Sequence, residues 1–205
     1  MLFINLGFII FNREVYYNLN NLIILISFTL ILTLDIALRP ISKDKDKFKY
    51  PIISIILFLL LPFLSIIPYL EFKLIIKIYL IFWDNFFVYL FALLILVIGG
   101  GVLLYSRILL GKYASSKIVI EKDHILITNG IYNFIRHPIY LGMLLVFFGY
   151  ALSFKSIISA ISFLVLFFVI FNNRMNLEEQ LLKEKFGTEY EDYLNKTKRI
   201  IPYIY

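Results

Sequence analysis

The sequence contains no cysteine. Disulfide bonds, thiolate catalysis and cysteine-ligated metals are therefore excluded. Histidine is almost as scarce, because His124 and His137 are the only two in the chain. They lie 13 residues apart with no third ligand in helical register. A zinc site takes three or four ligands, so we predict no metal site.

Charged residues are also few, at 17%, while 61% of the 205 residues are hydrophobic. The mean hydropathy is +0.87, and this composition favours an all-α, multi-pass integral membrane protein. The net charge of +6 comes from basic residues between apolar segments. Membrane insertion and anionic lipids explain that placement, so we do not expect nucleic-acid binding. The first residues lack a basic stretch and a small-residue cleavage site, and we expect no signal peptide there.

The chain is rich in long apolar segments. Crossing the hydrocarbon core takes about 20 mostly apolar residues, and we predict five such spans. The connection between the last two is so short that they form an antiparallel helical hairpin. Two further apolar segments, 2–11 and 72–83, are expected to lie at the membrane interface. The predicted spans are residues 19–38, 52–70, 86–110, 139–154 and 156–171.

The basic residues give this arrangement an orientation. If the five spans alternate, 16 of the 20 Lys and Arg residues lie on one side of the membrane. The positive-inside rule then places the N-terminus outside and the C-terminus in the cytoplasm. We therefore divide the chain into N-terminal membrane helices, residues 1–110, and a cytoplasmic-side binding region with the hairpin, residues 111–205.

Two features of the early spans call for a structural interpretation. Gly99, Gly100 and Gly101 are expected to form a notch where another helix packs closely, although room for a ligand is an alternative. Asp35 precedes Arg39 by four residues, which predicts an ion pair along one helix. A functional carboxylate is the other interpretation of Asp35.

The chemistry is expected where the fourth span begins. Pro138 suits the first turn of a helix, and the N–H groups that follow have no partner within the helix and favour an anion. Arg136 and His137 lie at the same end, with Tyr140 and Gly142 one turn further on, where glycine would allow a close approach. Interfacial anchoring is the alternative for each residue alone, and the clustering of so many polar groups argues against it.

A second cluster follows the fifth span. Arg174 and Glu178 are four residues apart and share a helix face, either as a surface ion pair or as part of a site. The hairpin should bring them beside Arg136 and His137. Beyond them, apolar residues recur at helical spacing, which predicts an amphipathic helix, interrupted at Gly187, that lies along the cytoplasmic surface and covers the site.

At these residues the chain resembles the isoprenylcysteine carboxyl methyltransferase family, which is related to the phospholipid methyltransferases. The match covers roughly residues 111–202, whereas the first 110 residues match only as generic spans. One departure is Ile131, where the family often has proline. The matching motifs are Asp123–Tyr132, Arg136–Gly142, Arg174, Glu178–Glu179, Phe186–Tyr190 and Arg199–Pro202.

The resemblance implies a membrane-embedded methyltransferase that uses S-adenosyl-L-methionine and has no Rossmann-type domain. It implies that Arg174 and Glu178 are catalytic, with Arg174 and Arg136 on the side of the methyl acceptor. The acceptor would be a lipid-like or prenylated molecule that enters from the bilayer, with carboxyl O-methylation of an isoprenylcysteine as the expected reaction. The implied cofactor contacts are Lys117, His124, Ile125, Leu126, Ile127, Tyr132, His137, Pro138, Ile139, Tyr140 and Glu178.

Three alternatives stay open at this point. The first is a phospholipid amine N-methyltransferase of the same family. The second is an NADPH-dependent enzyme similar to the sterol reductases, which share motifs in a related C-terminal arrangement but are usually longer. The third is a membrane scaffold without catalytic activity, in which the polar window only anchors the helices at the interface. The sequence does not decide the acceptor or the oligomeric state.

Overall fold

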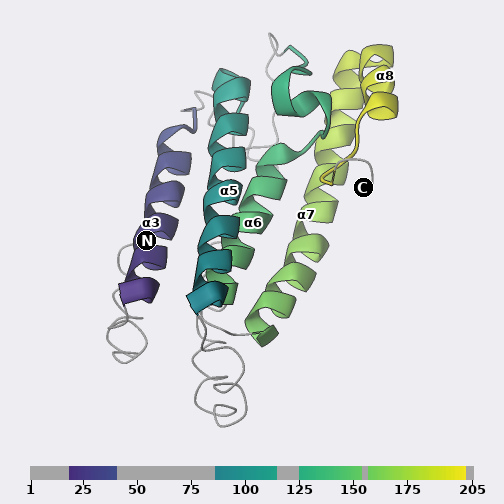
Figure 1. Ribbon diagram of the computed structural model, residues 1–205. Coiled ribbons are helices and arrows are strands. Elements are labelled where there is room, and N and C mark those ends of the chain that lie inside the picture. Colours follow the sequence, from purple (N-terminus) through teal and green to yellow (C-terminus); the bar gives the residue numbers. More distant parts are fainter. Residues whose placement is uncertain (1–18, 41–85, 115–124, 154–156, 202–205) are drawn as a thin grey trace, which may run out of the picture.

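A computed structural model describes residues 19–40, 86–114, 125–153 and 157–201. Four long helices stand side by side in Figure 1, in the order α3, α5, α6 and α7, and α8 lies beside the end of α7. Over the described ranges the only strand-like feature is one isolated parallel bridge. The helices are α3 (Leu19–Ala37), α5 (Phe86–Leu110), α6 (Pro138–Ser153), α7 (Ile157–Phe186) and α8 (Thr188–Lys196), with short 3-10 turns η1 (Gly111–Tyr113) and η2 (Gly130–Asn133).

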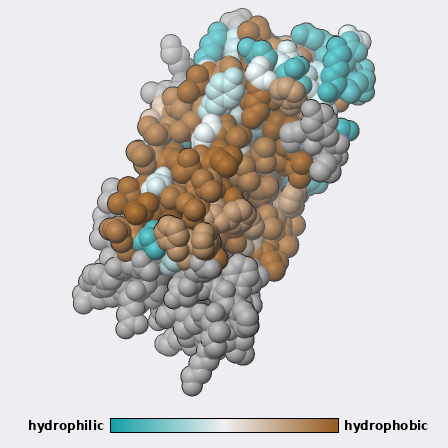
Figure 2. All heavy atoms as spheres, viewed as in Figure 1, coloured by the Kyte–Doolittle hydropathy of each residue, from teal (hydrophilic) through white to brown (hydrophobic). Residues whose placement is uncertain are grey.

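The apolar runs become helices close to their predicted bounds. α3, α5 and α6 begin and end within a residue of the expected spans. Among the described residues, α5 and α7 are long and apolar enough to cross a membrane, while α6 and the apolar part of α3 are shorter. The predicted second span and both interfacial segments lie outside the described residues. Figure 2 shows a broad apolar surface over the helices, with hydrophilic residues gathered at the end that carries α8.

Small residues let α5 and α6 pack with their backbones close together. A Cβ atom added at Gly142 would lie 2.6 Å from the backbone nitrogen of Leu103, and one at Gly99 would lie 2.7 Å from that of Val146. Gly100 faces the side chain of Ile31 of α3, whose Cδ1 would lie 2.5 Å from an added Cβ. The predicted packing notch is therefore confirmed at Gly99 and Gly100 but not at Gly101, where an added Cβ has nothing within 4 Å. The close approach expected at Gly142 is made by α5, since helix backbones meet most closely where side chains are smallest.

Replacing Gly142 by valine should destabilise the protein by about 2 kcal/mol or more, because the new side chain meets fixed backbone atoms. Gly101→Ala is the matched control, since a Cβ at Gly101 has nothing within 4 Å. It should be neutral or slightly stabilising, because alanine is the better helix former. Thermal unfolding in detergent measures both, and equal stability of the two variants would contradict the packing account.

A buried ion cluster joins α3 to α5. Arg39 donates to Asp35 Oδ2 at 2.5 Å, so the predicted ion pair is confirmed. Arg107 of α5 also donates to Asp35, from Nε to Oδ1 at 2.5 Å, and its NH1 donates to the Ala114 carbonyl at 2.9 Å. Asp35 is only 1% exposed. A single carboxylate thus holds two helices at the end of α5 from which the chain continues toward η2.

The end of the chain differs from the prediction in one respect. We expected the amphipathic helix to be a separate element that lies along the surface, but α7 continues without a break from its apolar part to Phe186. The reason is that residues 157–186 contain neither glycine nor proline, so no helix breaker stands between the two parts. The predicted interruption at Gly187 is confirmed, where a φ of +54° separates α7 from α8.

Candidate active site

The turn before α6 is held to its neighbours by Tyr132, the one buried residue of η2. Gly130 has a φ of +61°, which glycine adopts without strain, and it opens η2. The Tyr132 hydroxyl donates to the Ser106 carbonyl of α5 at 3.4 Å, and the Tyr132 carbonyl accepts from the Tyr193 hydroxyl at 2.6 Å. Burial, and then the nearby carboxylate of Glu178, raise the pKa of Tyr132. Its hydroxyl therefore stays protonated and acts as a donor.

The C-terminal segment runs beside the residues that lead into α6. Ile135 and Lys198 form a parallel bridge. The N–H of Arg136 donates to the Lys198 carbonyl at 2.8 Å, and that of His137 donates to the Arg199 carbonyl at 2.9 Å. This pairing fixes the backbone just before Pro138, which begins α6 as predicted. Sequence periodicity could not reveal it, because a two-residue pairing leaves no alternating pattern.

The start of α6 and the polar part of α7 form a first polar cluster. The Tyr140 hydroxyl donates to Glu178 Oε2 at 2.8 Å and accepts from Arg174 Nε at 2.8 Å. The Arg174 guanidinium lies 6.0 Å from the centre of the Tyr140 ring. Tyr140 itself is buried, whereas the Glu178 side chain is 40% exposed. The expected meeting of the two sequence clusters is thus present, with Tyr140 as the link between them.

A second polar cluster lies beside the first and is centred on Glu179. Its Oε1 accepts from Arg136 Nε at 3.1 Å and from His137 Nε2 at 3.0 Å. Arg199 donates to both oxygens, from Nε at 3.1 Å and from NH2 at 2.6 Å. Arg136 and Arg199, from two separate segments, therefore contact the same carboxylate. One carboxylate therefore ties together α6, α7 and the C-terminal segment.

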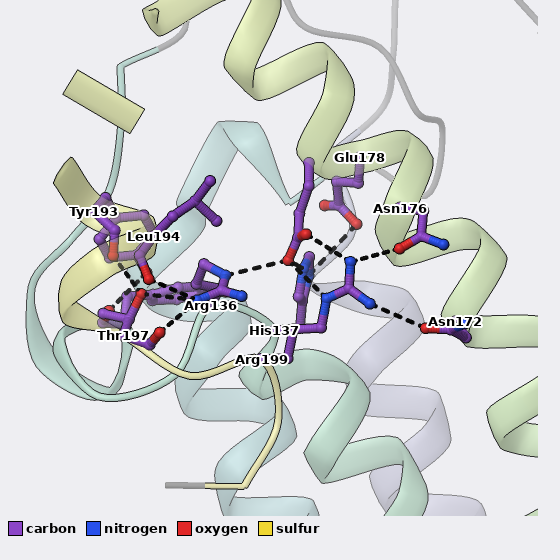
Figure 3. Close-up of polar contacts among 11 residues, drawn as sticks. Arg136, His137, Asn172, Asn176, Glu178, Tyr193, Leu194, Thr197 and Arg199 are labelled. Carbon is purple, nitrogen blue, oxygen red and sulfur yellow. Dashed lines mark hydrogen bonds and ion pairs between the residues drawn. The ribbon is translucent and has the colours of Figure 1, made fainter. Parts of the chain in front are cut away.

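The two arginines also reach beyond Glu179. Arg136 NH1 donates to the carbonyls of Thr197 at 2.5 Å and Leu194 at 3.3 Å. Arg199 donates to the side-chain oxygens of Asn172 at 3.0 Å and Asn176 at 2.5 Å on α7. These contacts, drawn in Figure 3, fasten the C-terminal segment across the hairpin. The contacts of Arg136 are thus with the protein's own chain, so its predicted contact with substrate stays a prediction.

The remaining predicted residues have different outcomes. Lys117 and His124 lie outside the described residues. Ile125, Leu126 and Ile127 precede η2 without regular structure, and Ile125 is 58% exposed. Pro138 is buried and Ile139 is half-buried at the start of α6.

The predicted site did not include Glu179, Arg199, Asn172, Asn176 or Arg107. Glu179 and Arg199 belong to the motifs that carry the resemblance, so a signal for them was present. Each of these two residues lies 20 or more positions from its partners in sequence, and motif spacing alone cannot predict such contacts.

The geometry suits a cation better than an anion. His137 is 5% exposed, and its Nε2 is taken by Glu179 while Nδ1 lies 3.9 Å from Glu178 Oε2. A neutral His137 ring has one donor, which Glu179 already accepts, so His137 has no donor left for the anion expected at this helix start, and its contact with a cofactor stays a prediction. The exposed carboxylate of Glu178 can accept from an ammonium group or a hydroxyl. Within the described ranges no three His, Cys, Asp or Glu residues are grouped to hold a metal.

Comparison with known proteins places the chain in a family. The model of the phospholipid methyltransferase family matches residues 87–189, which include α5 except for its first residue, α6, α7, and the residues of both polar clusters except Arg199. The chain belongs to this family. The resemblance to the isoprenylcysteine carboxyl methyltransferases is confirmed by curated relatives and by the fold. With α5 and α7 long enough to span a bilayer, this family member is an integral membrane protein.

Three relatives and one solved structure give the extent of the similarity. Protein-S-isoprenylcysteine O-methyltransferase of Schizosaccharomyces pombe is 36% identical over 84 residues, 41% of this chain and 36% of the relative. A probable protein-S-isoprenylcysteine O-methyltransferase of Oryza sativa subsp. indica is 31% identical over 123 residues, 59% of this chain and 64% of the relative. Protein-S-isoprenylcysteine O-methyltransferase B of Arabidopsis thaliana is 36% identical over 88 residues, 43% of this chain and 45% of the relative.

The structure of the eukaryotic intramembrane Ras methyltransferase ICMT has the same fold, with a TM-score of 0.67 and 18% identity over 98% of this chain and 74% of that one. The chain spans about a third to two thirds of the length of the curated relatives described above.

Proposed function

We propose that this protein is a membrane methyltransferase that uses S-adenosyl-L-methionine to methylate the carboxylate of an isoprenylcysteine or a similar lipid-like acceptor. The observation that carries the proposal is the pair of hydrogen bonds that joins Arg174 and Glu178 through the Tyr140 hydroxyl. It places a cation and a partly exposed carboxylate on the two sides of one buried hydroxyl. Such a pair can hold two charged reactants of opposite sign next to each other, as methyl transfer from a sulfonium to a carboxylate requires.

The residues of the site fit this cofactor. Its α-ammonium group needs acceptors, and Glu178 Oε2 and His137 Nδ1 lie 3.9 Å apart on the same side of the site. The hydroxyl groups of its ribose can be bound by carbonyls of the segment 125–127, and Lys117 and His124 are further proposed contacts. When bound, S-adenosyl-L-methionine supplies a methyl group attached to a positively charged sulfur. Because that charge disperses during in-line displacement, a water-poor pocket and close alignment favour the reaction.

Arg174 favours a carboxylate as the acceptor. A carboxylate is ionised at neutral pH, so it needs only to be oriented, and a guanidinium binds it through parallel hydrogen bonds. Its oxygen then forms the new bond to the methyl carbon as the carbon–sulfur bond breaks, and no proton has to move. Arg136 is a further proposed contact on the acceptor side.

A phospholipid amine is the second candidate acceptor, and the description of the matching family favours it. An amine must lose a proton before it can attack, which requires a general base. Glu178 could take that proton, but the nearby guanidinium of Arg174 would repel a protonated amine. We therefore place the carboxylate first. We also propose that the site faces the cytoplasm, with the N-terminus outside, and that the acceptor enters sideways from the bilayer.

Ligand binding gives the first test. S-adenosylhomocysteine at about 100 times its dissociation constant should stabilise the folded protein by about 2.7 kcal/mol. For a chain of this size that is a rise in melting temperature of about 5–10 °C. NADPH at the same concentration should produce no shift. Stabilisation by NADPH alone would favour the reductase alternative and contradict the proposal.

The acceptor is tested separately with the purified protein in lipid. Methyl transfer to a farnesylated cysteine with a free carboxylate is compared with transfer to phosphatidylethanolamine. We expect base-labile methyl ester in the first reaction and no N-methylated lipid in the second. The reverse result would assign the protein to phospholipid amines and would leave the proposed cofactor intact.

A further inference from the structure

The Glu179 carboxylate accepts hydrogen bonds from three side chains of the site, yet Glu179 has no role in the proposed reaction. Arg136, His137 and Arg199 all donate to its two oxygens. Its side chain is only 14% exposed, so it has little room for a ligand of its own. The contacts indicate that Glu179 acts on its neighbours rather than on a substrate.

Of these neighbours, His137 is the one whose chemistry depends on Glu179. An ionised carboxylate only accepts hydrogen bonds, and the two arginines beside Glu179 favour its ionised form. The 3.0 Å contact with His137 Nε2 therefore requires the proton of a neutral ring to be on Nε2. The tautomer of a histidine is set by the hydrogen bond that one ring nitrogen makes, so Nδ1 is left with a lone pair.

The second ring nitrogen has a definite place in the site. Nδ1 lies 3.9 Å from Glu178 Oε2, beyond hydrogen-bonding distance. Two acceptors therefore face the same space, one from His137 and one from Glu178. If the proton were on Nδ1 instead, the ring would turn a donor toward Glu178, and one of the two acceptors would be lost.

We propose that Glu179, held in place by Arg136 and Arg199, is a positioning residue that fixes His137 as the Nε2–H tautomer and leaves Nδ1 as an acceptor beside Glu178. The tautomer itself follows from this structure alone. Its use, which is to bind the ammonium group of the methyl donor, rests on the proposed function. The C-terminal segment then has a part in the site, because Arg199 brings it to Glu179.

Arg199 is suited to this task because it is itself fixed. Its guanidinium contacts both oxygens of Glu179 and the side-chain oxygens of Asn172 and Asn176. A rigid planar fork can make such divergent contacts at once, whereas a lysine ammonium concentrates its donors at one point. Arg199→Gln should lose the ability to hold Glu179 in place. Arg199→Lys should keep only part of it.

The nitrogen chemical shifts of His137 test the proposal directly. With two histidines in the chain, ¹⁵N-histidine labelling gives two sets of ring signals, and a His124→Gln variant assigns them. At pH 8, without any ligand, the wild-type ring should show one protonated nitrogen, Nε2. In Glu179→Gln a population protonated at Nδ1 should appear, because the neutral amide is a weaker acceptor than the remaining carboxylate of Glu178.

Binding of S-adenosylhomocysteine is then measured by calorimetry on the same samples. Removing the outer partner of a metal-binding histidine typically costs 10–100-fold in affinity, and by the same reasoning we expect the affinity for S-adenosylhomocysteine to fall about tenfold or more in Glu179→Gln and in Arg199→Gln. Lys183→Gln is the control, since Lys183 is on the same helix but pairs with Glu191 at the surface. That variant should leave both the ring signals and the affinity unchanged.

The results separate this proposal from the proposed function. A wild-type ring protonated at Nδ1, or at both nitrogens at pH 8, overturns the inference whether or not the variants fold. So does a loss of affinity in Glu179→Gln with the tautomer unchanged, because Glu179 would then act by another route. If instead the tautomer responds as expected but the wild-type protein binds no S-adenosylhomocysteine, the positioning role stands and the proposed function fails.

Discussion

Arg174→Ala should lower kcat/KM for a prenylated cysteine carboxylate by about 100-fold or more. Truncating one partner of a buried, hydrogen-bonded charge pair commonly costs about 2–5 kcal/mol, a factor of about 30 to several thousand, and the expected loss lies within this range. Arg174 lies 2.8 Å from the Tyr140 hydroxyl and so has a fixed position from which to orient an anion. Affinity for S-adenosylhomocysteine should change little, because we propose that the ammonium group of this ligand binds to Glu178 rather than to Arg174. The measurement is initial-rate methyl transfer together with calorimetry.

A competitive inhibitor shows whether Arg174 recognises the charge. In the wild-type protein a prenylcysteine carboxylate should bind more tightly than the corresponding carboxamide, and in Arg174→Ala the difference should disappear. Lys183→Ala, which removes a positive charge from the same helix at the surface, should leave that difference intact. If the carboxylate keeps its advantage in Arg174→Ala, Arg174 does not bind the acceptor and an amine becomes the better candidate.

The helices could be predicted from the sequence because apolar runs of this length have few alternatives. α5 begins at Phe86 and ends at Leu110, the bounds that the hydropathy pattern gives. Its neighbours were harder to identify. The glycines at 99 and 100 predicted a close contact, but nothing in the pattern told that α6 meets the first and α3 the second. Helix pairing depends on complementary surfaces, which a single sequence does not display.

The site was predictable where chain connectivity brought residues together. The short hairpin between α6 and α7 was expected to bring Arg174 and Glu178 beside the start of α6, and both contact Tyr140 there. The hairpin does not place Arg199, because its position depends on a backbone pairing between Ile135 and Lys198, 63 residues away in sequence. Such pairings are decided by unsatisfied peptide groups on both partners, and side-chain patterns do not reveal them.

The adjacent residues Glu178 and Glu179 should lose stability to different extents when each is replaced by alanine. Glu179→Ala removes the carboxylate shared by Arg136, His137 and Arg199. These donors are largely buried, so water cannot fully replace the hydrogen bonds that they lose. Breaking a buried pair by deleting one partner costs about 3–5 kcal/mol, and with Arg136 and Arg199 partly exposed we expect about 3 kcal/mol. The melting temperature in detergent should fall by about 6–12 °C.

Glu178→Ala is the matched control, because the side chain is 40% exposed and accepts a hydrogen bond from the Tyr140 hydroxyl. Its loss should cost about 1 kcal/mol, the value of a single hydrogen bond, while binding of S-adenosylhomocysteine should be abolished. Stability would then depend chiefly on Glu179 and ligand binding directly on Glu178. If both variants lost stability equally and bound ligand equally, the two glutamates would form a single structural cluster. The assignment of a structural role to Glu179 and a ligand-binding role to Glu178 would then be wrong.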